Sequence, residues 1–185
     1  LRIVTAYAGK LLERVKKIAQ GAALMTETEV HIQVLGGLND YIPNDTASRL
    51  LADAFLAYGG PDFGEEEYAI ARKFFETLPE EDRKRAAASG ARLNGISEEE
   101  FAARPLSTAV EPYSEKVRQT LMPGSTDVGD VSHIAPTGQY MVTGVVLGTG
   151  DHTWQFTAQI GTSIGDKSAQ SIARAIAYAS AQVYE

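Results

Sequence analysis

A short, nearly continuous run of apolar residues is the feature that most constrains how this chain can fold. The run lies within residues 139–147 and is rich in valine. Such a run is typical of a strand that is covered on both faces of its sheet. We therefore expect residues 139–147 to form a buried strand in an α/β fold. Its apolar members are Tyr140, Met141, Val142, Val145, Val146 and Leu147.

The first 38 residues show a second pattern, in which a strand, a helix and another strand follow one another. Residues 1–7 and Thr28–Leu35 alternate apolar and polar side chains, as half-buried strands do. Apolar residues recur at helical spacing over residues 10–26. Because two strands and one helix bury little apolar surface, we expect half of a small α+β layer that requires a partner segment or a second chain.

Helical patterns cover much of the chain between these two regions. We expect a helix from Asn44 or Asp45 to Gly59, a helix from Glu65 to Leu78, a new start at Pro79 and a capping box at Ser97–Glu100. The pattern is weak over residues 83–114 and ambiguous over Trp154–Ile160. A last helix opens between Ser163 and Asp166. Lys167 lies in its first turn, where a cation opposes the helix dipole, and we interpret it as a sign of an ionic contact.

Composition excludes several classes of protein. The net charge of −7 argues against nucleic-acid binding. The absence of cysteine excludes a disulfide framework and a thiolate metal site, and it fits a cytoplasmic protein. No apolar run approaches the roughly 20 residues of a membrane span, and no signal peptide is visible, so we expect no membrane partner. The first residue is Leu1 rather than Met, and we interpret the chain as part of a longer polypeptide.

The candidate chemistry lies in an Asp-rich turn at Gly124–His133 and in a glycine loop at Gly148–Gln155. Gly148 and Gly150 let the loop backbone approach a ligand closely, which would place His152 on an open loop beside a carboxylate. Taken alone, a histidine in such a loop is more often a surface or packing residue than a metal ligand. In the turn, Thr126 or Asp127 can cap a short helix, and this structural role is as plausible as a role in binding.

The two segments carry a resemblance to a known family. The sequence Gly-Ser-Thr-Asp-Val-Gly-Asp-Val-Ser at 124–132, the Pro136–Thr137 pair and Gly-Asp-His-Thr-Trp-Gln at 150–155 resemble the C-terminal part of the M20 metal-dependent amidohydrolases and peptidases. Within that family the chain is most similar to the aminobenzoyl-glutamate utilisation protein B branch. The resemblance implies that residues 39–185 are the C-terminal part of a Zn-peptidase-like α/β catalytic domain. Residues 1–38 would then be the second half of a ferredoxin-like lid and dimerisation domain.

The resemblance also implies roles for single residues. His152 matches the C-terminal metal-ligand histidine of the family, and Asp151 is near enough to orient it. The substrate site would be lined from both segments, by Thr126, Asp127, Gly148 and Gly150. Thr126 stands where many members carry glutamate, which fits the aminobenzoyl-glutamate branch better than the peptidases.

The implied function is hydrolysis of the amide bond of an N-acyl or aroyl amino acid, of the aminobenzoyl-glutamate kind, or of a dipeptide. The full-length enzyme would be a homodimer that binds two divalent metals, zinc or manganese. The catalytic base and the other ligands lie ahead of the lid in this family. We therefore expect no catalytic residue in this chain and no activity from it alone. The alternative is a non-catalytic oligomerisation module that pairs through its strand edges.

Overall fold

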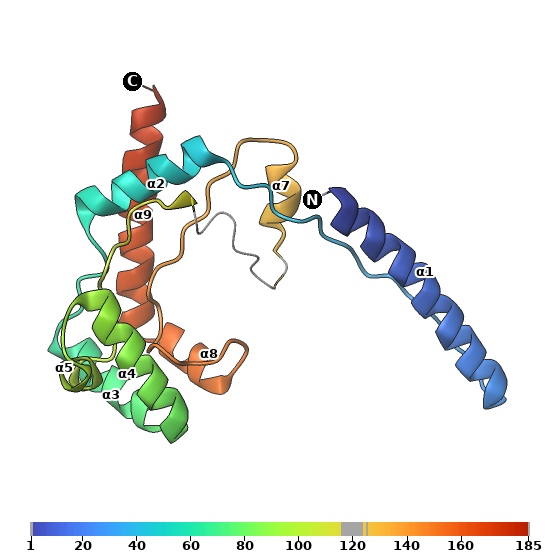
Figure 1. The fold of residues 1–185 in the computed structure, drawn as a ribbon, viewed down its shortest axis with the longest axis horizontal. Helices are drawn as coiled ribbons and strands as arrows, with labels where there is room; N and C mark the ends of the chain where they lie inside the picture. Colours follow the sequence, from blue (N-terminus) through green and yellow to red (C-terminus); the bar gives the residue numbers. More distant parts are fainter. Residues whose placement is uncertain (1, 116–123, 125, 185) are drawn as a thin grey trace. The chain divides into compact units, whose positions relative to one another are not determined.

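The computed structural model describes residues 2–115, 124 and 126–184, and all regular secondary structure in these residues is helical (Figure 1). Leu1 of the first expected strand and Ser125 of the Asp-rich turn lie outside the described residues. The helices are α1 (Arg2–Met25), α2 (Asp45–Tyr58), α3 (Glu65–Glu76), α4 (Glu80–Asn94), α5 (Glu98–Ala103), α7 (Val128–Ser132), α8 (Trp154–Ile160) and α9 (Ser163–Tyr184).

The chain divides into two compact units, which we describe separately. The first unit holds Leu1–Ala47 and Glu115–Gly138, and the second holds Ser48–Ser114 and Gln139–Glu185. The expected division between residues 1–38 and 39–185 stays a prediction. None of the helices in the described residues is long and apolar enough to cross a membrane.

In the first unit, both expected strands are absent from the described residues. Residues 2–7 belong to α1, and residues 28–35 run on after the helix without pairing to another described segment. The chain reverses direction at Glu27, whose φ is 55° (Figure 1). The physical reason is that a helix completes its hydrogen bonds within itself, whereas an alternating segment needs a neighbouring strand. The expected helix over residues 10–26 is confirmed and starts earlier.

The apolar side chains of this segment are not packed. Val15 and Ile18 on α1 are 57% and 68% exposed, and Leu35 is 89% exposed. Exposed apolar surface of this extent normally indicates a surface that contacts another chain or segment. The expectation that a unit of this composition requires a partner stays a prediction.

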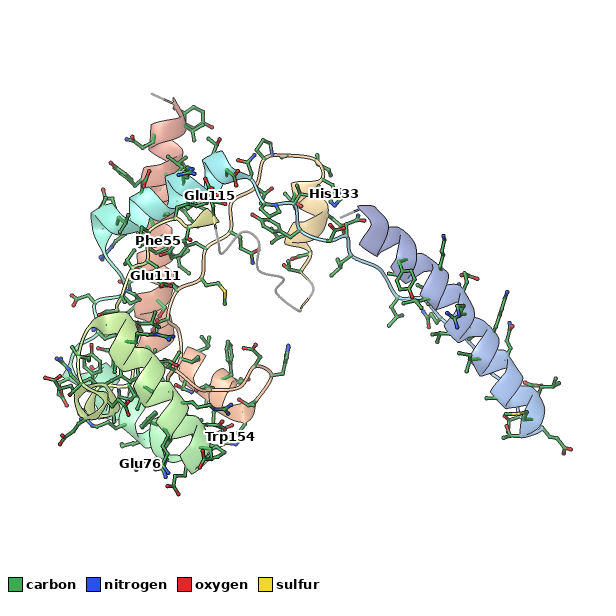
Figure 2. The ribbon with its side chains drawn as sticks, viewed as in Figure 1. Phe55, Glu76, Glu111, Glu115, His133 and Trp154 are labelled. Atoms are coloured by element: carbon green, nitrogen blue, oxygen red, sulfur yellow. The ribbon has the colours of Figure 1, made fainter. Side chains whose placement is uncertain are left out.

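The second unit is built on two apolar clusters. One gathers residues of α3 and α4 with Leu106, Val146 and Ile164, and the other joins α2 to α9. Phe55 of α2, which Figure 2 labels, stacks on Tyr140 with the ring centroids 4.0 Å apart. The expected helices at 44–59 and 65–78, the start after Pro79 and the last helix are confirmed.

The buried strand expected over residues 139–147 is wrong. Val146 is fully buried, but Met141 is 73% exposed, and the run follows an irregular path over the helices. Its apolar side chains pack on different helices. Tyr140 and Val142 pack between α2 and α9, and Val146 packs against α3 and α4. The expected α/β fold, with its Zn-peptidase-like sheet and half ferredoxin-like layer, is therefore contradicted by the all-helical structure of the described residues. A continuous apolar run indicates that its side chains are buried. Such a run forms a strand only where a partner strand is available.

Candidate functional site

The backbone of the glycine loop places His152 in the open. His152 has a φ of 59°, a left-handed conformation that few residues other than glycine adopt. Its side chain is exposed and makes no hydrogen bond or ion pair within the described part of the chain. Asp151 is also exposed, and the structure shows no hydrogen bond from it to the imidazole. The imidazole nitrogens of His152 are thus available to a ligand.

A buried glutamine side chain holds both ends of the glycine loop through hydrogen bonds. Gln159 of α8 is fully buried, and its side-chain oxygen accepts a hydrogen bond of 2.7 Å from the backbone N–H of Val146. Its side-chain nitrogen donates to the Thr149 hydroxyl at 3.1 Å and to the Gln155 carbonyl at 3.0 Å. One side chain therefore fixes both ends of the loop, because buried polar groups stay paired in a stable fold.

The two glycines of the loop have different surroundings. Gly148 has a φ of 92°, and a side chain there would lie 3.0 Å from the Cβ atom of Ala86 on α4. Gly150 accepts a hydrogen bond of 2.8 Å through its carbonyl from the Thr153 hydroxyl, which also caps α8. Trp154 follows and is exposed, with its ring 6.2 Å from that of Phe74 (Figure 2). The loop is thus short, fixed at its base and open at His152.

The Asp-rich turn belongs to the first unit, where α7 contacts the segment at residues 39–42. The Asp130 carboxylate accepts hydrogen bonds from the backbone N–H of Asn39 at 2.9 Å and from its side-chain amide at 2.7 Å. These bonds, the backbone one first, lower the pKa of Asp130. A side chain on Gly129 would lie 2.1 Å from the Asn39 carbonyl oxygen, so only glycine permits this approach.

Two further contacts join α7 and the residue that follows it to the segment at residues 39–42. Ser132 accepts a hydrogen bond of 2.9 Å from the N–H of Ile42. His133, labelled in Figure 2, lies one turn beyond Asp130, but its Nε2 atom is 3.0 Å from the carbonyl oxygen of Asp40. The His133 ring thus contacts Asp40, in the segment at residues 39–42. Most of the Asp-rich turn has a structural role here.

The substrate-site candidates of this turn lie at its start. The Thr126 hydroxyl accepts a long hydrogen bond of 3.4 Å from the N–H of Val128. Asp127 is the N-cap of α7, but its side chain makes no capping hydrogen bond. Thr126 is therefore the residue that caps, and the exposed Asp127 carboxylate is not used in this way. These two residues and the His152 loop belong to separate units.

The second unit contains a buried ion pair, and the sequence indicated only one of its two residues. The Lys167 ammonium lies 2.6 Å from the carboxylate of Glu67, whose side chain is 2% exposed. Burial favours a higher pKa for Glu67, but the hydrogen bonds from Lys167 and the Gly64 N–H outweigh it and lower the pKa to about 2. The ionic contact expected for Lys167 is confirmed. Glu67 was not foreseen, since it is one of three consecutive acidic residues at a helix start.

In the residues that the structure describes, no group of three or more histidine, aspartate or glutamate side chains is placed to share a metal ion. His152 is thus a possible single ligand, and the chain's other described donors do not surround it. An exposed imidazole without another partner in the described residues fits the donor chemistry of zinc.

Comparison with known proteins gives one informative match. No family model matches the chain, and no solved structure matches it. A curated protein of Escherichia coli (strain K12), the B-type subunit of p-aminobenzoyl-glutamate hydrolase, is 36% identical over 171 residues. The chain is similar to part of a hydrolase.

The similarity to this p-aminobenzoyl-glutamate hydrolase covers 90% of the present chain and 35% of the relative. The chain thus spans about a third of the length of the protein that it matches. This match supports the aminobenzoyl-glutamate branch that the motifs at 124–132 and 150–155 indicated. The wider M20 family is not shown and stays an expectation.

Proposed function

We propose that this chain is part of a metal-dependent amidohydrolase that cleaves an N-acyl or aroyl amino acid of the aminobenzoyl-glutamate kind. The similarity to p-aminobenzoyl-glutamate hydrolase supports the reaction class. The observation that carries the proposal within this chain is the geometry of His152, which is exposed, unpartnered in the described residues and held with φ at 59°. Backbone strain of this kind is found most often at functional sites, where surrounding contacts maintain it.

In this proposal His152 supplies one ligand to a site for two divalent ions, zinc or manganese. The metal would lower the pKa of a bound water and polarise the amide carbonyl. Gly148 and Gly150 shape the loop that presents the imidazole, and Gln159 holds the loop through its hydrogen bonds to Val146 and Thr149. Thr126 and Asp127 would contact the substrate. The remaining ligands and the catalytic base belong to sequence outside this chain.

The test compares the full-length protein that carries these residues with this chain alone. N-acyl and aroyl amino acids, including aminobenzoyl-glutamate, are assayed with added Zn²⁺ or Mn²⁺. The full-length protein should hydrolyse them, and this chain alone should not. His152→Ala should lower kcat/KM by more than the roughly 10–100-fold that is typical of losing a group behind a metal ligand. Hydrolysis by the chain alone would contradict the assignment of the base to another segment.

A second candidate, an oligomerisation module, is favoured by one observation. The apolar face of α1 and the residues around Leu35 are exposed, as a contact surface would be. If the chain serves only in assembly, His152→Ala leaves the metal content and activity of the full-length protein unchanged. The same variant thus separates the two candidates. A role in assembly through residues 1–38 is also compatible with the hydrolase as a homodimer.

A further inference from the structure

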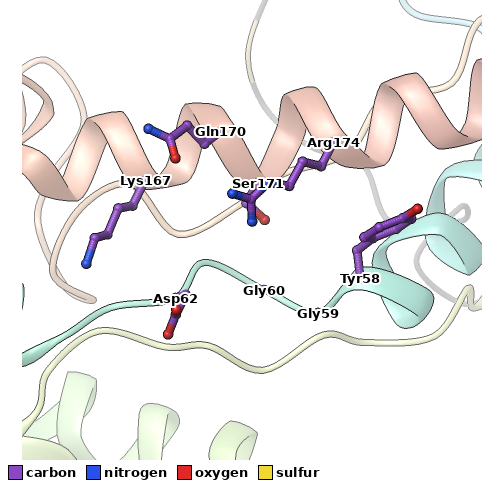
Figure 3. Close-up of a pocket in the computed structure, with 8 residues that line it drawn as sticks. All are labelled: Tyr58, Gly59, Gly60, Asp62, Lys167, Gln170, Ser171 and Arg174. Carbon is purple, nitrogen blue, oxygen red and sulfur yellow. The ribbon is translucent and has the colours of Figure 1, made fainter.

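The second unit contains a small polar pocket between α9 and the segment that follows α2 (Figure 3). Its volume is about 120 Å³, well above the roughly 10–15 Å³ that a cavity needs to hold one water molecule. Drug-sized ligands occupy pockets of roughly 300 Å³ or more, so this one suits a small head group. The lining residues are Tyr58, Gly59, Gly60, Asp62, Lys167, Gln170, Ser171 and Arg174.

The walls of the pocket are fixed by the backbone. Gly59 ends α2 with φ at 79°, and its N–H donates to the Phe55 carbonyl at 2.8 Å. A side chain on Gly60 would lie 2.6 Å from the carbonyl oxygen of Thr108. The segment is therefore held between Thr108 on one side and α9 on the other. Because glycines line this wall, no side chain fills the space.

The opposite wall is one face of α9. Lys167, Gln170, Ser171 and Arg174 follow one another at intervals of three, one and three residues, and the first and last lie two turns apart on one side of the helix. Figure 3 shows Lys167 and Arg174 extending from this face beside the Tyr58–Asp62 segment.

The charges of the pocket are divided between the two walls. Lys167 is already paired with buried Glu67 at 2.6 Å. Arg174 and Asp62 each line the pocket but form no ion pair with any residue that the structure describes. The Ser171 hydroxyl and the Gln170 amide also make no hydrogen bond within the described residues. Asp62, Gln170 and Arg174 are exposed, and the charge of Asp62 also acts on Lys167. One cation, one anion and two neutral hydrogen-bonding groups around this space are therefore without a direct hydrogen bond or ion pair in the described residues.

Such a set is poorly suited to a simple anion. The Asp62 carboxylate repels an anion that Arg174 would bind, and Glu67 already occupies the other cation. A ligand that carries both charges avoids this conflict, since its carboxylate can accept from Arg174 while its ammonium donates to Asp62. An N-acylated amino acid lacks the second contact, because its nitrogen is an uncharged amide.

We propose that this pocket binds the zwitterionic head group of a free α-amino acid, with the carboxylate on Arg174 and the ammonium on Asp62. Ser171 and Gln170 complete the hydrogen bonds to the carboxylate. The side chain of the amino acid points to solvent, since the pocket has room only for the head group. The site requires neither His152 nor a metal, so it stands independently of the proposed hydrolase function.

The test is a titration of the 185-residue chain, followed by isothermal calorimetry or by amide chemical shifts at neutral pH. The probes are L-alanine, N-acetyl-L-alanine and acetate. L-alanine should bind in the millimolar range and shift the amides of residues 59–62 and 170–174. N-acetyl-L-alanine and acetate should each bind at least tenfold more weakly. Equal binding of acetate and L-alanine would show an anion site and overturn the proposal.

Matched variants locate the site. Arg174→Gln and Asp62→Asn should each weaken L-alanine binding at least tenfold, whereas Asp62→Asn should leave acetate binding equal or stronger. The controls Arg92→Gln and Asp53→Asn remove exposed charges outside the pocket and should change nothing. Circular dichroism verifies that each variant keeps its helices. Absence of L-alanine binding to the unchanged chain, or equal binding by all variants, would refute the assignment.

Discussion

The ammonium of Lys167 on α9 and the carboxylate of Glu67 on α3 lie 2.6 Å apart, although they are a hundred residues apart in the chain. The Glu67 side chain is 2% exposed, and its oxygen also accepts a hydrogen bond of 2.7 Å from the Gly64 N–H. This pair joins the start of α3 to the start of α9. It therefore connects α3, which lies near the end of the His152 loop, to α9, which lines the proposed amino-acid pocket.

Replacing Lys167 with methionine should destabilise the second unit by about 3 kcal/mol. The change leaves the buried Glu67 carboxylate without its cation, which costs more than the ion pair itself contributes. The control is Lys84→Met, which breaks an exposed pair with Glu80 and should cost less than about 1 kcal/mol. Urea unfolding measures both. Equal losses in the two variants would contradict a special role for the buried pair.

The same carboxylate should make stability depend on pH. The pKa of Glu67 is about 2 in the folded chain, below its ordinary value of 4.5. A lowered pKa means that the stabilisation is complete above pH 4.5 and is lost as the pH falls toward 2. The difference corresponds to about 3 kcal/mol. Urea unfolding at neutral and acidic pH measures how much unfolding free energy the chain loses on acidification. This loss should be smaller in Glu67→Gln than in the unchanged chain. An identical loss in both would show that groups other than Glu67 cause the pH dependence.

Gln159 should control the order of the His152 loop. Gln159→Leu keeps the volume but leaves the Val146 N–H and the Thr149 hydroxyl without partners, at a cost of about 1–3 kcal/mol. Faster hydrogen exchange at Val146 is the direct measurement. Gln155→Leu removes a side chain that makes no hydrogen bond in the described residues and should stay within about 0.5 kcal/mol. Slow exchange at Val146 in the Gln159→Leu variant would show that other contacts hold the loop.

Gly129 should determine whether α7 docks on the segment at residues 39–42. Gly129→Ala places a methyl group 2.1 Å from the Asn39 carbonyl oxygen, and overpacking of this kind costs about 1–3 kcal/mol. Hydrogen exchange at Asn39 and Ile42 should accelerate. Gly21→Ala, on an exposed part of α1 with open space around it, should instead stabilise its helix slightly. If the Asn39 amide stays equally protected from hydrogen exchange in Gly129→Ala, this contact between α7 and residues 39–42 is refuted.

The sequence predicted the helices well because their signals are local. Ser97 and Glu100 form the expected capping box, with hydrogen bonds of 3.1 Å and 2.9 Å. Asn44 caps α2 by accepting from the Ala47 N–H at 2.9 Å. The expected strands were wrong because a strand depends on a distant partner, which an apolar or alternating pattern does not report. The run at 139–147 is buried in part, but its side chains pack on different helices.

The candidate site was predictable only in its outline. The glycines around His152 indicated an open loop, and the structure shows exposure and a left-handed backbone at this residue. Gln159 gave no signal, because a single glutamine in an ambiguous stretch is ordinary. The pocket on α9 could not be predicted from the sequence either, since Arg174 and Asp62 become informative only when both are known to line one pocket.

The most direct test of His152 as a metal ligand is the metal content of the full-length protein that carries these residues. The protein should bind two divalent ions per chain, and fewer than two in His152→Ala under the same conditions. His31→Ala serves as the control, since His31 is a highly exposed histidine in the first unit and should leave both ions bound. Two ions retained by His152→Ala would contradict the assignment of this imidazole as a metal ligand.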